Sequence, residues 1–136
     1  SRPIPKSTGL DDFHLSWVDA QIAKLSTPIR PEDVQATLLE LTVNTVRLEL
    51  SRHAPRTGHL VVCGGGALNA HLMTRLAQVL PQVQVEDSGV WGLPVLQVEA
   101  TAFAWLAHQA VHRLTGNLPA VTGARGARVL GAIYPA

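Results

Sequence analysis

The stretch His59-Leu60-Val61-Val62-Cys63-Gly64-Gly65-Gly66-Ala67-Leu68-Asn69 decides the fold of this chain. Its first five residues form a largely apolar run with β-branched side chains, which predicts a buried parallel strand. Three glycines end the strand. Apolar residues at Leu72, Leu76 and Val79 then predict a helix from about Asn69 to Leu80.

Further elements are expected on both sides of this unit. Pro31 suits the first turn of a helix, and Glu32 and Asp33 place negative charge there, so a long helix is expected from Pro31 to His53. Two apolar stripes along this helix predict that it is buried on most sides. The order of elements predicts an α/β fold with right-handed crossovers. The other expected elements are a short helix over Phe13–Leu25, a strand over Gln82–Glu86, a helix over Val95–Leu114 and a last strand over Val129–Tyr134.

Length and composition restrict the class of protein. With 136 residues the chain is expected to form a single domain over residues 1–136, in which residues 1–30 provide a lead-in segment and a short helix. Charged residues make up only 15% of the chain, whereas an average globular domain has about 25%. Such a shortage fits a face that packs against another lobe or subunit. A net charge of +1 without a Lys/Arg cluster argues against a nucleic-acid partner.

The single cysteine, Cys63, excludes an internal disulfide and indicates a reducing compartment, so a cytoplasmic location is expected. Because Cys63 ends an apolar strand, we expect it to be a small core residue rather than a nucleophile. No apolar run approaches the ~18 residues of a membrane span, so no membrane partner is expected. The chain begins with Ser1 rather than Met, which fits processing, a tag remnant or a piece of a longer protein.

The glycine turn, Gly64-Gly65-Gly66, is the first candidate site. Residues without side chains at the carboxyl end of a strand let a ligand approach the backbone closely. The next helix offers unpaired N–H groups and the positive end of its dipole, which suit a phosphate or the sugar of a nucleotide. The alternative is a tight strand-to-helix turn that binds nothing.

A dinucleotide-binding domain is a second alternative for the same turn. The turn nearly matches G-x-G-x-x-G, and Glu86 and Asp87 follow about 20 residues later, where a ribose-binding acid would lie. Against this interpretation, Asn69 stands where a third small residue should allow close helix–strand packing. Only about 70 residues follow, too few for a typical catalytic partner domain.

His108 and His112 stand one helical turn apart, which is the ligand spacing of a helical zinc site. Gln109 occupies the place of the Glu that a zinc hydrolase needs, and no third ligand is evident. A solvated helix face is therefore expected, and no metal site. Three scattered tryptophans are expected to be core or interface anchors: Trp17, Trp91 and Trp105.

Glu99 is the second candidate site residue. It lies near the start of its expected helix, on the same stripe as Phe103, Leu106 and Ala110. A carboxylate on an otherwise apolar stripe needs a partner or a ligand. An acid near a helix N-terminus also stabilises the helix dipole, and the pattern supports both roles equally.

Several stretches together resemble the carboxyl-terminal half of the anhydro-N-acetylmuramic acid kinases. The resemblance covers essentially the whole chain, and the third and fourth stretches are its most specific parts. The stretches are Pro5–Gly9 (PKSTG) followed by a Phe and a Trp, Cys63–Asn69 (CGGGALN) with Leu72-Met73, Glu99–Ala107 (EATAFAWLA), Gly116–Ala124 (GNLPAVTGA) and the ending Val129–Pro135 (VLGAIYP).

This resemblance implies one lobe of an actin-like, ribonuclease H-like ATPase fold of the sugar kinase and heat-shock type, with a mixed sheet and flanking helices. The family uses ATP with Mg²⁺ to phosphorylate 1,6-anhydro-N-acetylmuramic acid while water opens the anhydro bridge. The product, N-acetylmuramic acid 6-phosphate, belongs to peptidoglycan recycling. By the match, Gly64, Gly65, Gly66 and Asn69 lie beside the nucleotide, and Glu99 corresponds to an acid that contacts the sugar.

The resemblance also implies what this chain lacks. The family's phosphate loop and its catalytic Asp belong to an amino-terminal lobe, so no catalytic residue is expected here and the isolated chain is expected to be inactive. The family's dimers suggest a homodimer. The chain departs from the family at Leu10-Asp11, after the Lys-Ser-Thr-Gly turn, and at Leu96-Gln97-Val98 before Glu99, which affects the sugar contact. A stand-alone nucleotide-binding or interaction module without catalysis is the alternative function, ahead of the dinucleotide-binding domain.

Overall fold

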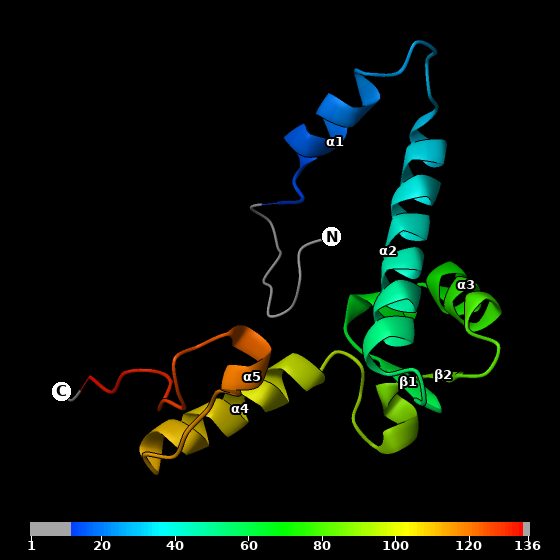
Figure 1. Ribbon diagram of the computed structural model, residues 1–136. Helices are drawn as coiled ribbons and strands as arrows, with labels where there is room; N and C mark the ends of the chain where they lie inside the picture. Colours follow the sequence, from blue (N-terminus) through cyan, green and yellow to red (C-terminus); the bar gives the residue numbers. More distant parts are fainter. Residues whose placement is uncertain (1–11, 135–136) are drawn as a thin grey trace. The chain divides into compact units, whose positions relative to one another are not determined.

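The computed structural model describes residues 12–134. It shows an α/β arrangement, as the alternation of patterns predicted (Figure 1). The motif Pro5–Gly9 and the residues Leu10-Asp11 lie outside the described residues. The elements are the helices α1 (Leu15–Ile22), α2 (Pro31–His53), α3 (Ala70–Val79), α4 (Val98–Val111) and α5 (Pro119–Thr122), the strands β1 (His59–Val62) and β2 (Gln84–Asp87), and the 3₁₀ helices η1 (Gly65–Leu68) and η2 (Ser88–Trp91).

The chain divides into two compact units. Residues 29–101 form one unit, and the segments up to Pro28 and from Ala102 onward form the other. The first unit contains α2, both strands, α3 and the start of α4, so it holds all five candidate site residues. The second contains α1, most of α4 and the carboxyl-terminal segment. None of the described helices is long and apolar enough to cross a membrane.

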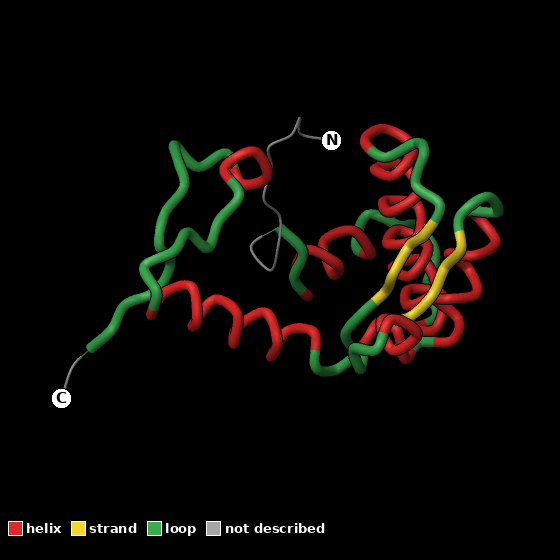
Figure 2. The backbone as a smooth tube through the Cα atoms, turned by 90° about the horizontal axis from the view of Figure 1, so that it is seen from below, coloured by secondary structure: helices red, strands yellow, loops and turns green. Residues whose placement is uncertain are grey.

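The sheet of the first unit consists of two parallel strands among the described residues. β1 and β2 pair from His59 with Gln84 to Val62 with Asp87, and they lie side by side in Figure 2. The family resemblance implied a mixed sheet, but the only pairing in residues 12–134 is parallel, as the apolar run of β1 predicted. Because α3 separates the two strands in the chain, both strands can run in the same direction.

The core of the first unit lies where α2 and α3 meet. Val43 of α2 and Leu76 and Leu80 at α3 are its buried apolar residues. The predicted bounds of α2 are confirmed, and its amino end has Pro31 in the first turn. The prediction that α2 is buried on most sides is wrong for this structure, since Val43 is its only buried residue among those described. Apolar side chains on the other stripe stay uncovered, since Leu41 is 43% and Leu48 38% exposed.

An ion pair joins the same two helices. The Arg75 guanidinium of α3 donates from Nε to Oε1 of Glu40 at 2.5 Å and from Nη2 to Oε2 at 3.0 Å. This bidentate hydrogen bonding lowers the pKa of the Glu40 carboxyl and raises the pKa of Arg75. Burial of Glu40 opposes the shift to a smaller extent.

Strand β1 is less buried than predicted. Leu60 and Val62 face the helices and are half-buried, whereas Val61 is 43% exposed and Cys63 is exposed. The prediction that Cys63 is a core residue is therefore wrong. The reason is that side chains alternate between the two faces of a strand, and in this structure the helices cover only one face.

In the second unit, α4 is rich in apolar residues but has no buried residue. Phe103 is 63% exposed and Trp105 is 51% exposed. Asn117, just beyond α4, organises the loop that follows α5. Its Nδ2 donates to the Gly126 carbonyl at 3.1 Å, and its Oδ1 accepts from the Arg128 amide at 2.6 Å. Asn117 is thus a structural residue in this loop.

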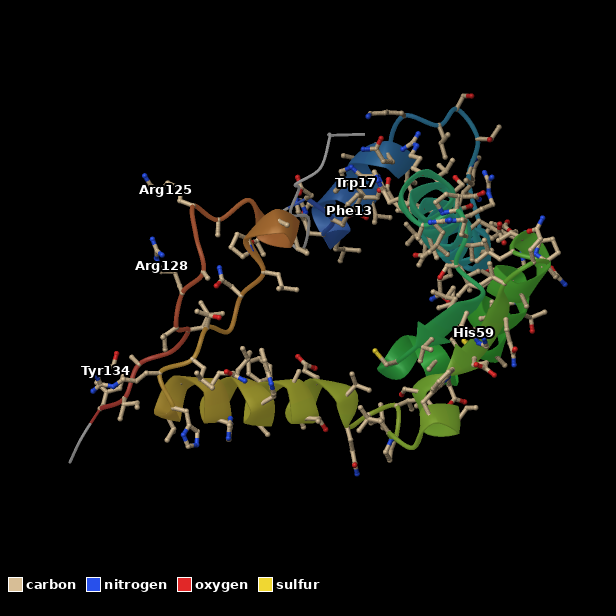
Figure 3. All side chains as sticks on the ribbon, turned by 60° about the horizontal axis from the view of Figure 1, so that its bottom comes forward. Phe13, Trp17, His59, Arg125, Arg128 and Tyr134 are labelled. Carbon is tan, nitrogen blue, oxygen red and sulfur yellow. The ribbon has the colours of Figure 1, made fainter. Side chains whose placement is uncertain are left out.

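The predicted strand over Val129–Tyr134 is absent from the structure. The segment is irregular up to Tyr134, and Gly131 has a φ of +96° that interrupts an extended run. The bounds of α1, α3 and α4 differ from the predicted ones by one to three residues, as is common at helix ends. At the amino end, α1 starts after His14, whose Nδ1 accepts a hydrogen bond from the Trp17 amide at 3.2 Å. Trp17 packs edge-on against Phe13, and Figure 3 labels both residues.

Candidate nucleotide and sugar site

The glycine turn lies at the carboxyl edge of the parallel strands. β1 ends at Val62, level with Asp87 of β2, and the chain then turns at Gly64. Gly64 has φ +72° and ψ −167°, a conformation that is open to glycine and strained for other residues. The turn therefore requires glycine at this position. In open α/β sheets, ligands bind outside the carboxyl ends of the strands.

The space beside the turn is open. A Cβ atom added at Gly64 or Gly65 would meet no atom within 4 Å, and one added at Gly66 would touch only Leu72 Cδ2, at 3.5 Å. The backbone at Gly64 and Gly65 is consequently accessible to a ligand on the side where side chains would project. Protein packing does not by itself account for the absence of a side chain at Gly65.

Asn69 caps α3. Its Oδ1 accepts a hydrogen bond from the Leu72 amide at 3.1 Å. The sequence predicted that the helix begins at Asn69, but Asn69 is the capping residue and α3 begins at Ala70. The side-chain NH₂ group of Asn69 makes no hydrogen bond within residues 12–134. It remains able to donate to a ligand at the start of α3, where the positive end of the helix dipole lies.

A backbone hydrogen bond connects the turn to the approach to α4. The Gly64 amide donates to the Val95 carbonyl at 2.8 Å, and the first turn of α4, which contains Glu99, starts at Val98. No sequence pattern predicts this contact, because a carbonyl group is common to every residue. The contact brings the segment before Glu99 to the edge of the sheet that carries the glycine turn.

Glu99 is exposed and has no hydrogen-bond or ion-pair partner in the described part of the chain. Its expected neighbours on α4 do not bury it, because Phe103 is itself exposed and Leu106 and Ala110 are only half-buried. A solvated carboxylate in the first turn of a helix stabilises the helix dipole, and it is also free to bind a ligand. The structure thus leaves both predicted roles of Glu99 open.

The two acids at the end of β2 differ in what they contact. Glu86 accepts from Trp91 Nε1 at 3.2 Å and lies 3.3 Å from His59 Nδ1. Figure 3 labels His59 beside the strands. Asp87 Oδ1 accepts from the Gly89 amide at 2.7 Å, which fixes the turn into η2. Both acids therefore support the loop that leads toward Val95.

No group of three or more His, Cys, Asp or Glu side chains within residues 12–134 could hold a metal ion. Mg²⁺ is commonly bound through one or two carboxylates together with the phosphates of a substrate. The candidate site therefore offers backbone N–H groups, the Asn69 amide and the Glu99 carboxylate, and these groups suit the binding of an anionic or hydroxyl-rich molecule.

The chain is also similar to known proteins. The family described as "Anhydro-N-acetylmuramic acid kinase" matches residues 1–136. Curated relatives carry the same name. The relative from Ralstonia nicotianae is 56% identical over 136 residues, 100% of this chain and 36% of the relative. Those from Cupriavidus pinatubonensis and Xylella fastidiosa are each 54% identical, over 96% and 98% of this chain and 35% of each relative.

The chain therefore spans about 35% of the length of the curated relatives it matches. The family match covers every candidate site residue, from Gly64 to Glu99. A match over the whole chain, together with relatives more than half identical to it, shows the relationship. This chain belongs to the anhydro-N-acetylmuramic acid kinase family.

Proposed function

We propose that the chain is the carboxyl-terminal lobe of a kinase that converts 1,6-anhydro-N-acetylmuramic acid to N-acetylmuramic acid 6-phosphate. ATP supplies the phosphoryl group, and water opens the anhydro bridge. In the proposal the lobe has the actin-like fold, forms one functional domain over residues 1–136, and works in the cytoplasm in peptidoglycan recycling. The catalytic base lies in an amino-terminal lobe, and the complete enzyme is a homodimer.

One observation carries the assignment of roles. The hydrogen bond from the Gly64 amide to the Val95 carbonyl places the glycine turn next to the segment that leads to Glu99. A nucleotide on the turn and a sugar near Glu99 could then approach each other. Phosphoryl transfer depends mainly on positioning and charge stabilisation. A backbone hydrogen bond that holds the two proposed binding segments together would therefore help to position the nucleotide and the sugar.

The residues at the turn fit a nucleotide. Open space beside Gly64 and Gly65 lets the backbone contact a flat or anionic group, and the Asn69 amide is available to donate a hydrogen bond. When bound, ATP supplies the transferable phosphoryl group and its Mg²⁺ neutralises phosphate charge. In the proposal the chain's own residues bind the nucleotide and orient the sugar.

A lobe that binds nucleotide without taking part in catalysis is the competing function. It predicts that changes at the glycine turn alter nucleotide affinity but that changes at Glu99 leave sugar turnover intact. Family membership favours the kinase, whereas the dinucleotide-binding alternative has no support from the relatives.

The test is Gly65→Val in an enzyme of the full length of the relatives. Gly65 has no positive φ, so valine causes no backbone strain there, and its branched side chain would project into the open space. We expect the KM for ATP to rise by about tenfold or more, the loss expected when a positioned contact of ~1.4 kcal/mol is removed, with a smaller change in the KM for the sugar.

Gly58→Val is the matched control. Gly58 precedes β1 at the opposite edge of the sheet, and a Cβ there also meets nothing within 4 Å. This variant should retain the KM for ATP. Equal KM values in folded Gly65→Val and Gly58→Val enzymes would refute the nucleotide assignment.

A further inference from the structure

The end of α4 brings two imidazoles together. His108 and His112 stand four residues apart, and their ring centroids are 4.3 Å apart with a 41° angle between the ring planes. Their spacing is that of a helical zinc site, but because no third ligand is evident, the sequence predicted a solvated helix face. The structure adds that the two rings are in contact, although rings on the same helix face need not adopt rotamers that bring them together.

This geometry suits a single metal ion held by both rings. Neutral imidazole is the commonest protein ligand for transition metals, and a zinc–nitrogen bond is about 2.0–2.1 Å long. One ion can therefore join two rings only if they lie side by side. Rings that are tilted rather than parallel can direct a nitrogen of each ring toward a common point.

The position on the helix favours a cation as well. His108 lies in the last turn of α4, and the His112 amide still donates to the His108 carbonyl at 3.1 Å, so the pair belongs to the carboxyl-terminal end of the helix. The negative end of the helix dipole lies there and attracts positive charge. Both residues are exposed, so water can complete the coordination of the ion.

We propose that His108 and His112 form a two-ligand site for a divalent transition-metal ion such as Zn²⁺ or Cu²⁺. The site differs from a catalytic zinc centre, which has three protein ligands. It uses none of the residues of the proposed nucleotide and sugar site. A bound ion would link two successive turns of the helix and stabilise the last part of α4.

The test is titration of the 136-residue chain with ZnCl₂ or CuCl₂, followed by calorimetry and, for Cu²⁺, by electron paramagnetic resonance. We expect one ion per chain and a copper spectrum with two nitrogen ligands. Affinity should follow the Irving–Williams order, with Cu²⁺ bound more tightly than Zn²⁺. The melting temperature should rise with metal concentration, because a ligand that binds only the folded state stabilises it.

His108→Gln and His112→Gln should each weaken binding by at least about tenfold, since even an outer-shell partner of a metal ligand contributes that much. Circular dichroism establishes that each variant folds. His53→Gln is the matched control, because His53 also ends a helix and pairs with Glu49 at 3.4 Å. Unchanged affinity in His108→Gln and His112→Gln, or loss of binding in His53→Gln instead, would overturn the proposal.

Discussion

Kinetic measurements on a Glu99 variant distinguish the two predicted roles of this residue, which are contact with the sugar and stabilisation of the helix dipole. In the full-length enzyme, Glu99→Gln should keep the fold and the affinity for ATP but lower sugar kcat/KM by about 10²-fold, the scale expected when a group that positions a substrate is lost. If Glu99 only complements the helix dipole, the change should cost about 0.3–1 kcal/mol of stability and leave kcat/KM nearly intact. Melting temperature and sugar kinetics on one preparation distinguish these outcomes.

Glu32→Gln is the matched control for this experiment. Glu32 also lies in the first turn of a helix, at the start of α2, and it has no place in the candidate site. It should lose a little stability and no activity. If Glu99→Gln behaves in the same way, Glu99 is a dipole-stabilising acid and not a sugar ligand.

Arg113 is the only described residue other than glycine with a positive φ, at +55°. It follows α4 at the position where helices commonly end with glycine, and the Leu114 amide donates back to the Gln109 carbonyl at 2.8 Å. Arg113→Gly should raise the free energy of unfolding by about 0.5–1 kcal/mol. Relief of the left-handed conformation is worth about 1–2 kcal/mol, and the added freedom of the unfolded chain offsets about 0.4–1 kcal/mol of it.

Denaturant unfolding of Arg113→Gly beside Arg113→Ala measures this effect. Alanine removes the guanidinium but keeps the Cβ atom, so it should give little or no gain. Equal stability of the glycine and alanine variants would mean that the backbone at Arg113 is not strained.

Between α2 and α3, the Glu40–Arg75 pair links stability to pH. The folded pKa of Glu40 lies below its ordinary value of 4.5, so the pair contributes its full stabilisation above pH 4.5. The contribution is lost as the pH falls from 4.5 through the folded pKa. We expect the difference in melting temperature between the unmodified chain and Glu40→Gln to be constant from pH 6 to 8 and to shrink below pH 4.5.

The matched control for this pair is Glu32→Gln, whose exposed carboxylate lies at 3.4 Å from Arg30 within one helical turn. Exposed pairs contribute little because solvent screens them, so this variant should show a smaller effect. A melting difference for Glu40→Gln that persists unchanged to pH 3 would contradict the assigned role of the carboxylate.

The helices and the glycine turn depend on residues close in the sequence, and the sequence predicted them. Features that depend on contacts between distant residues were not predicted. The bounds of α2 follow from Pro31 and two acids at its start, and the turn follows from the three glycines, all of which act within a few residues. Burial of Cys63 depends on what covers the outer face of β1, and the strand expected after Val129 needs a neighbouring strand to pair with. Neither partner can be inferred from the segment itself. The Gly64–Val95 hydrogen bond was unpredictable for the same reason.

For the molecule as a whole, we expect the 136-residue chain to form no sugar phosphate from ATP and 1,6-anhydro-N-acetylmuramic acid. The chain spans about 35% of its curated relatives, and phosphoryl transfer needs groups that surround the reacting atoms. The measurement is release of ADP and formation of sugar phosphate, with a full-length relative as positive control. Turnover by the purified chain, with contaminating kinase excluded, would contradict the proposed division between two lobes.

The hydrogen bond between Gly64 and Val95 also bears on the order in which the chain folds. It joins residues separated by all of α3 and β2, and contacts between distant residues form late because the chain must first be closed into a loop. We therefore expect the glycine turn to reach its final conformation after the helix and strand between these residues are in place. A chain whose packing is incomplete would then lack the ordered turn, and binding at the proposed nucleotide site would report on completed folding.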